Sequence, residues 1–193
     1  MKILDNIYIL FSDIADFSKI TNDYSLAERL IDSSDKMFNK IEKDFRGTIR
    51  NIVGDAYILT FTNIEDLLKS TKYIHTYWRN AYNTHNLLRL RLGIHKGKML
   101  HYKNFFGGES FNMAAMLESS GKYTNAYQNN KNVVVTHVSD LVMKDAIKFN
   151  KNYKNDFINI RDEELNNNHF INYRKKFFQT TYIYNPNILW TVI

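Results

Sequence analysis

Two aspartates in this sequence stand where they could hold a divalent cation. Asp13 closely follows a short apolar run, and Asp55 lies in a glycine-containing turn between two β-rich runs. A single aspartate in a turn is most often an ordinary capping residue. Two carboxylates that converge at strand ends, however, form the hard oxygen site that Mg²⁺ and Mn²⁺ prefer. The pair therefore predicts a metal site suited to phosphoryl chemistry.

A loop and a helix start carry further candidate ligand-binding groups. The loop from Ala15 to Ser18 enters a helix, and consecutive backbone N–H groups at such a junction can cradle phosphate oxygens. Asn112 opens a predicted helix beside Gly107 and Gly108, whose small size lets a ligand approach the backbone. Asn112 can also be interpreted as a simple helix cap. Taken together, the segments favour a phosphate-binding site over isolated turn residues.

These residues need a sheet that brings distant segments together. Short β-rich or alternating runs predict strands at residues 7–11, 48–53, 56–62, 88–95, 133–136 and 182–184. Apolar residues at helical spacing predict helices at 25–45, at 64–82, from about 109, and at 139–147. Clean alternation within 88–95 predicts one solvent-exposed face, which carries Arg91. Asparagine-rich stretches at 128–132 and 150–155 predict surface loops.

The order β-α-β-β-α-β predicts an α+β fold, a ferredoxin-like sandwich with a C-terminal extension of strand and helix. We expect the helices to cover one side of its sheet. In this topology the first and third strands are neighbours, so the end of the first strand faces the turn at 54–55 and Asp13 approaches Asp55. The fold hosts many functions, so the site residues must decide among them.

The length of 193 residues predicts a single domain spanning residues 1–193. A hydrophobic fraction of 44% excludes disorder, and the absence of cysteine excludes disulfides, thiolate zinc sites and cysteine nucleophiles. No run approaches the ~18 apolar residues of a membrane-spanning helix, and no signal-peptide pattern opens the chain. We therefore expect a cytoplasmic protein without a membrane partner.

The formal net charge of +6 predicts attraction to a polyanion such as a nucleic acid, an anionic membrane or a triphosphate. An RNA-binding domain of this fold would carry aromatic residues at fixed positions on its central strands. Neither that pattern nor a basic stripe is present in the sequence. We therefore expect no nucleic-acid partner, and the composition alone does not choose the polyanion.

Four segments of the sequence resemble the catalytic domain of the class III nucleotide cyclases, the adenylate and guanylate cyclases. They are residues 11–18, 52–57, 91–97 and 108–119, in the order of the family. The resemblance implies a homodimer with two composite sites at its interface and two Mn²⁺ or Mg²⁺ ions per site. It also implies the reaction, in which a nucleoside triphosphate becomes a 3′,5′-cyclic monophosphate and pyrophosphate.

The resemblance further implies a role for each matching residue. Asp13 and Asp55 would hold both ions together with the backbone carbonyl of Ile14, and Asn112 of the opposite subunit would orient the ribose. Arg91 would bind phosphate. The backbone cradle for the triphosphate would be formed by Ala15, Asp16, Phe17 and Ser18.

One position departs from the family at the reacting end of the site. Met116 stands one helical turn after Asn112, where the family has an arginine that stabilises the transition state. Loss of this cation predicts low activity unless another basic residue or a partner subunit replaces it. The candidates for this role are Arg50, Lys96, Lys98 and Lys122. A late phosphate-binding lysine of the family could correspond to Lys175 or Lys176.

The two positions that select the base also depart. Asn51 stands where adenylate cyclases have lysine and guanylate cyclases have glutamate, and the partner position falls at Phe105, or at Asn104 if the glycine pair shifts the count. Asn51 can both donate and accept hydrogen bonds, and a bulky Phe105 would narrow the base pocket.

Without either purine code, the stand-alone domain resembles the pyrimidine cyclases of the bacterial Pycsar antiphage system, which make cyclic UMP or cyclic CMP. UTP is therefore the favoured substrate. The alternatives are a cytidylate, adenylate or guanylate cyclase, or an inert nucleotide-binding module.

Overall fold

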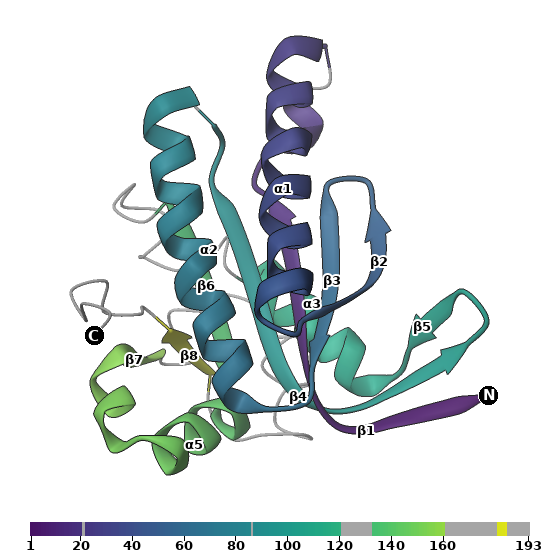
Figure 1. Ribbon diagram of the computed structural model, residues 1–193, viewed down its shortest axis with the longest axis vertical. Helices are drawn as coiled ribbons and strands as arrows, with labels where there is room; N and C mark the ends of the chain where they lie inside the picture. Colours follow the sequence, from purple (N-terminus) through teal and green to yellow (C-terminus); the bar gives the residue numbers. More distant parts are fainter. Residues whose placement is uncertain (21, 86, 121–132, 161–180, 185–193) are drawn as a thin grey trace.

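The computed structural model describes residues 1–20, 22–85, 87–120, 133–160 and 181–184. Their strands are β1 (Lys2–Ile14), β2 (Thr48–Val53), β3 (Ala56–Phe61), β4 (Leu90–Tyr102), β5 (Phe105–Gly107), β6 (Val134–Ser139), β7 (Phe157–Ile160) and β8 (Thr181–Tyr184). Their helices are η1 (Phe17–Lys19), α1 (Tyr24–Asp44), α2 (Ile64–His85), α3 (Glu109–Ser120), α5 (Asp140–Phe149) and η3 (Lys151–Asp156). The strands form one sheet in the order β2-β3-β1-β4-β6-β8-β7, with β5 paired to β4 (Figure 1).

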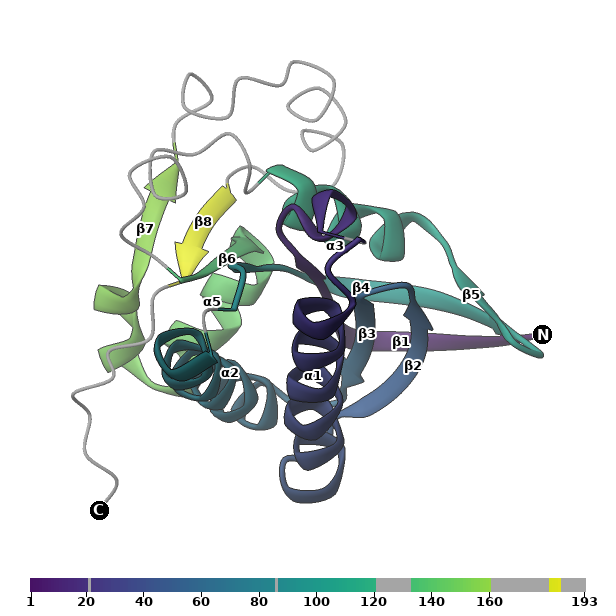
Figure 2. The same ribbon diagram turned by 90° about the horizontal axis from the view of Figure 1, so that it is seen from above.

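Helices lie on both faces of this sheet. The larger core joins α1, α2 and α5 to one face, where Leu10 and Leu92 are buried, and the smaller core joins Ala114 of α3 to Ile9 on the opposite face (Figure 2). The fold class is the expected α+β sandwich. The expectation of helices on one side only is wrong, because α3 packs closely against the second face.

Two glycines of β4 make this close packing possible. A Cβ atom on Gly93 would lie 2.0 Å from the carbonyl oxygen of Ala114, and one on Gly97 would lie 2.0 Å from Oγ of Ser110. The face of β4 that alternation predicted to be solvent-exposed is therefore buried under α3, and Arg91 is only 5% exposed. The alternation is real, but both faces of the strand are covered.

The central strand β1 pairs with β3 on one side and β4 on the other, both antiparallel. This confirms the predicted adjacency of the first and third strands. The pairing of β1 with β4 is irregular between Leu4 and Ile7, where Asn6 has a positive φ of 53°. The part of β1 before this irregularity extends away from the helices beside the β4–β5 hairpin (Figure 1).

Short elements were missed by the sequence patterns. The strands β5 and β7 were not predicted, and the stretch at 150–155 expected to be a loop largely forms the 3₁₀ helix η3. The loop expected at 128–132 lies outside the described residues.

Among the residues described, none of the helices is both long and apolar enough to pass through a membrane.

Candidate functional site

Asp13 and Asp55 come together at one end of the sheet. Asp13 is the last residue but one of β1, and Asp55 lies in the β2–β3 turn, where Gly54 adopts a positive φ of 61°. The backbone N–H of Ile14 donates a hydrogen bond to Oδ2 of Asp55, at a distance of 2.9 Å. The neighbouring strands β1 and β3 thus hold the two carboxylates side by side, as the topology predicted.

A small pocket of about 190 Å³ opens at this point of the sheet. It is lined by Asp13, Ile14, Asp16, Phe17, Ser18, Asp55 and Arg91. The chain turns around the pocket because Asp16 takes a left-handed conformation, with φ 63°. After this turn the chain enters η1. Ala15 does not line the pocket, because it is buried and its N–H donates to the carbonyl of Arg89 at 2.8 Å. Of the predicted phosphate cradle, residues 16–18 face the pocket.

Arg91 connects the pocket to the helix α3. It lies directly opposite Asp13 in the β1–β4 register, and one of its terminal nitrogens, Nη2, donates to Oδ2 of Asp13. Its Nε atom donates to Oε1 of Glu118 at 2.5 Å. Glu118 is buried on α3 and was not predicted as a site residue. The signal in the sequence was a lone glutamate on the apolar side of a predicted helix.

Two carboxylates of this site, Asp55 and Glu118, have raised pKa values. Burial, followed by the negative charge of Asp13, raises the pKa of Asp55, and burial raises the pKa of Glu118. Burial opposes the charge of Arg91, but the adjacent Glu118 and Asp13 outweigh it and raise the pKa of Arg91. Fully ionised, the three carboxylates and one guanidinium carry a formal charge of minus two. A divalent cation would neutralise that charge.

The donor set fits such a cation. Asp13, Asp55 and the carbonyl of Ile14 supply the hard oxygen atoms that Mg²⁺ and Mn²⁺ prefer, and all three residues line the pocket. Within the described part of the chain, no group of three or more histidine, aspartate or glutamate side chains forms a complete metal site. The remaining coordination positions would therefore fall to a ligand or to water.

Three predicted ligand-binding residues lie outside this pocket. Asn112 is exposed in the first turn of α3, where its N–H donates to the carbonyl of Gly108 at 3.0 Å. Phe105 on β5 is 58% exposed. Asn51 on β2 is half-buried, and its Oδ1 accepts the N–H of Ile52 at 2.9 Å. The chain does not bring these three residues to Asp13 and Asp55.

Met116 is half-buried on α3, and three of the four basic residues considered as its substitute are described and have partners. Arg50 donates from Nε to Oγ1 of Thr60 at 2.7 Å, and Lys96 pairs with Asp145 at 2.7 Å. Lys98 is exposed and lies 3.2 Å from Asp5. Lys122, the fourth candidate, lies outside the described residues, as do Lys175 and Lys176, which were considered for the late phosphate-binding lysine.

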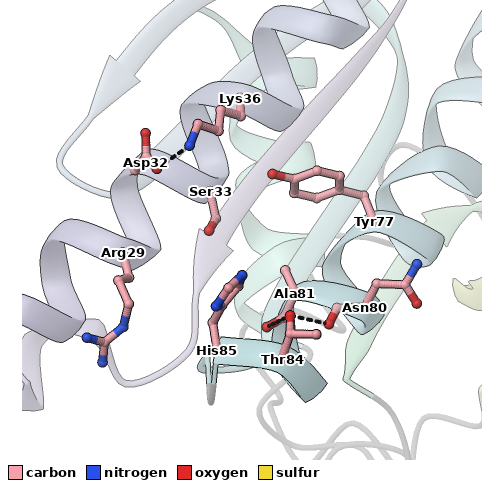
Figure 3. A pocket seen from close by; sticks show the side chains of 9 residues that line it. All are labelled: Arg29, Asp32, Ser33, Lys36, Tyr77, Asn80, Ala81, Thr84 and His85. Carbon is pink, nitrogen blue, oxygen red and sulfur yellow. Dashed lines mark hydrogen bonds and ion pairs between the residues drawn. The ribbon is translucent and has the colours of Figure 1, made fainter.

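A larger pocket of about 390 Å³ lies between α1 and α2, where none of the predicted site residues is found. Tyr77 and His85 reach from α2 toward α1 in this pocket (Figure 3). Two of its charged lining residues, Lys36 and Asp32, form an ion pair at 2.6 Å.

The fold matches that of solved nucleotide cyclase domains. The catalytic core of a rhodopsin–guanylyl cyclase with converted specificity, in complex with ATPαS, matches with a TM-score of 0.69 and 16% identity, covering 96% of this chain and 98% of that one. The adenylyl cyclase CyaB from P. aeruginosa matches with a TM-score of 0.63 and 16% identity, covering 97% of each chain.

The guanylate cyclase domain of RhGC from Catenaria anguillulae, in complex with GTP, matches with a TM-score of 0.65 and 17% identity, covering 97% of this chain and 100% of that one. No family model matches the sequence, and neither does any curated protein. At this level of identity the comparisons establish the fold, which is that of the class III adenylyl and guanylyl cyclase catalytic domains.

Proposed function

We propose that this protein is a metal-dependent nucleotide cyclase that converts a nucleoside triphosphate into its 3′,5′-cyclic monophosphate and pyrophosphate. One observation carries the proposal. Asp13 and Asp55 converge in a pocket whose other walls are the loop 16–18 and Arg91, on a chain with the class III cyclase fold. An excess of negative charge beside a loop that could cradle phosphate fits a triphosphate held through divalent cations.

Each group of residues has a distinct task in this proposal. Asp13, Asp55 and the carbonyl of Ile14 would hold Mn²⁺ or Mg²⁺, and backbone N–H groups of residues 16–18 would bind phosphate oxygens. The bound cations supply charge neutralisation on the phosphates and lower the pKa of the ribose 3′-hydroxyl. The protein itself then positions the hydroxyl in line with the α-phosphorus and the pyrophosphate leaving group.

A homodimer would complete the site. Asn112 is exposed on α3 and does not line the pocket of its own chain. A twofold dimer would let Asn112 of one protomer orient the ribose bound at Asp13 and Asp55 of its partner, and two equivalent sites would result.

We propose UTP as the substrate and antiphage signalling as the biological role, in a cytoplasmic protein. The support is the pair Asn51 and Phe105, which carries neither the adenine nor the guanine code of the family. Their positions on β2 and β5, outside the pocket at Asp13, suit contacts to the base across a dimer interface.

The test measures the products of all four nucleoside triphosphates. Purified protein with Mn²⁺ is incubated with ATP, GTP, CTP and UTP in separate reactions, and the products are identified by mass spectrometry. We expect cyclic UMP as the main product and no cyclic product from Asp13→Ala or Asp55→Ala, while Asp32→Ala on α1 keeps its activity. Turnover of ATP or GTP as fast as that of UTP and CTP would refute the pyrimidine assignment, and turnover in Asp13→Ala would refute the metal assignment.

A second candidate is an inert nucleotide-binding module, which Met116 specifically favours. Such a module would bind a triphosphate without releasing pyrophosphate. A coupled pyrophosphate assay beside calorimetric nucleotide binding separates the two candidates.

A further inference from the structure

Glu118 is a buried carboxylate with no task in the function proposed above. It lies on α3, its side chain is 6% exposed, and its Oε1 atom accepts a hydrogen bond from Nε of Arg91 at 2.5 Å. Its second oxygen, Oε2, accepts from Oγ of Ser119 at 3.2 Å. Burial of a carboxylate costs free energy unless its charge is compensated. The ion pair with Arg91 therefore offsets the cost of burying Glu118.

The contact fixes the guanidinium of Arg91 at two points. Glu118 accepts a hydrogen bond from Nε, and Asp13 on the neighbouring strand accepts one from Nη2. Because the guanidinium is planar, these two contacts set its orientation and leave little freedom to turn. The positive charge of Arg91 is therefore shared between two carboxylates, and Asp13 keeps part of its negative charge for another cation.

We infer that Glu118 is a positioning residue for the metal site. By accepting the hydrogen bond from Nε of Arg91, it weakens the electrostatic interaction between the guanidinium and Asp13. The inference rests on the proposed function, in which Asp13 holds a divalent cation. Without the charge of Glu118, Arg91 would pair with Asp13 alone and compete more strongly with the metal. The helix α3 thereby controls the affinity of a site formed at the end of β1.

A purely structural role for Glu118 gives a different expectation. If the residue only anchors α3 to the sheet, its replacement lowers stability but leaves the metal affinity of the folded protein unchanged. If it acts only as a distant negative charge, metal affinity falls whenever that charge is removed and is unaffected when the charge is kept.

Two variants of Glu118 separate these roles. Glu118→Gln keeps the shape and an acceptor but removes the charge, and Glu118→Asp keeps the charge but shortens the reach to Arg91. Mn²⁺ binding to the purified full chain is followed by electron paramagnetic resonance of the free ion, which needs no turnover. Glu109→Gln, an exposed position on the same helix, is the matched control, and circular dichroism verifies that each variant is folded.

We expect both Glu118 variants to raise the dissociation constant for Mn²⁺ by about tenfold, the lower end of the effect of residues that orient metal ligands. The Glu109→Gln control should stay within about twofold of the wild type. Wild-type affinity in folded Glu118→Asp means that only the distant charge matters, and it would overturn the inference, as would wild-type affinity in both variants. If Glu118→Gln fails to fold, Glu118→Asp decides, because it alone separates positioning from the effect of a distant charge. If Glu118→Asp fails to fold, the role counts as structural and the inference fails.

The same titration distinguishes this inference from the proposed function. A wild-type chain that binds no Mn²⁺ would remove the metal site and both proposals with it. A wild-type chain that binds Mn²⁺ and makes a cyclic product, beside Glu118 variants with unchanged affinity, would remove only the role of Glu118.

Discussion

At the scale of single residues, Arg91 shows how burial changes which groups a charged side chain can bind. From the sequence it was expected on a solvent-exposed face, available to a phosphate. In the structure its guanidinium lies between Asp13 and Glu118, and two of its nitrogens are occupied by carboxylates. Its remaining edge can still face the pocket that it lines. Any contact with phosphate would therefore be made by a guanidinium that is already fixed in place.

Replacement of Met116 by arginine tests whether the missing cation limits the reaction. We expect Met116→Arg to raise the rate of cyclic product formation by at least about tenfold, because a guanidinium would stabilise the charge that develops on the phosphates. The measurement is the initial rate of pyrophosphate release with saturating UTP and Mn²⁺.

Asn39→Arg provides the control for Met116→Arg, since it adds the same charge at an exposed position of α1, away from the pocket. An equal increase in both variants would show general attraction of the triphosphate. No increase in Met116→Arg would mean that position 116 does not face the reacting phosphates.

At the scale of elements, the sequence patterns located every helix of more than eight residues and six of the eight strands described here. They failed where the determining contact is distant in the chain. The three-residue strand β5 has no periodicity of its own and exists because it pairs with the end of β4. The position of α3 on the second face depends on Gly93 and Gly97, whose closeness to Ala114 and Ser110 no local pattern reveals.

The candidate site likewise has one contact that the sequence predicted and one that it did not. The approach of Asp13 to Asp55 was predictable, because it follows from strand adjacency in a known topology. The contact of Arg91 with Glu118 was not, because it needs both the placement of α3 and the direction of two side chains.

The packing of α3 on β4 predicts a large effect for one methyl group. Gly93→Ala would place a Cβ atom against the backbone of α3 at Ala114 and Glu118, so the helix would have to move away from the sheet. We expect the free energy of unfolding to fall by roughly 1–3 kcal/mol, measured by urea denaturation. Glu28→Ala at an exposed position of α1 should change it by less than about 0.5 kcal/mol. Wild-type stability in Gly93→Ala would contradict the tight contact.

At the scale of the whole molecule, the charge distribution differs from what the composition suggested. The chain has a net charge of +6, but the ionisable groups at the pocket carry a negative charge. The basic surplus therefore lies outside the pocket. In the proposed function this surplus would draw a triphosphate toward the protein at long range, while binding in the pocket itself would depend on the cations.

Composite sites in a dimer predict complementation between two inactive variants. When Asp13→Ala and Asn112→Ala chains are mixed and allowed to exchange subunits, half of the dimers should combine both chains, and each of these regains one intact site. We expect about a quarter of the wild-type rate of cyclic product formation, with random pairing. A mixture of Asp13→Ala with Asp55→Ala is the control and should stay inactive, because both changes affect the same half of the site. Equal rates in the two mixtures would rule out composite sites.

The irregularity of β1 at Asn6 has a mechanical consequence for such a dimer. Residues 2–4 pair with 99–101 beyond the irregularity, whereas residues 7–14 keep an unbroken register with β4 up to Asp13 and Arg91. The two paired stretches are thus separated by an irregularity of the kind that a β-bulge produces. We expect a partner that displaces the outer segment to change the backbone at Asn6, while the part of the strand that carries Asp13 keeps its alignment. In the proposed dimer, contacts at the outer end of β1 would then leave Asp13 at its inner end undisturbed.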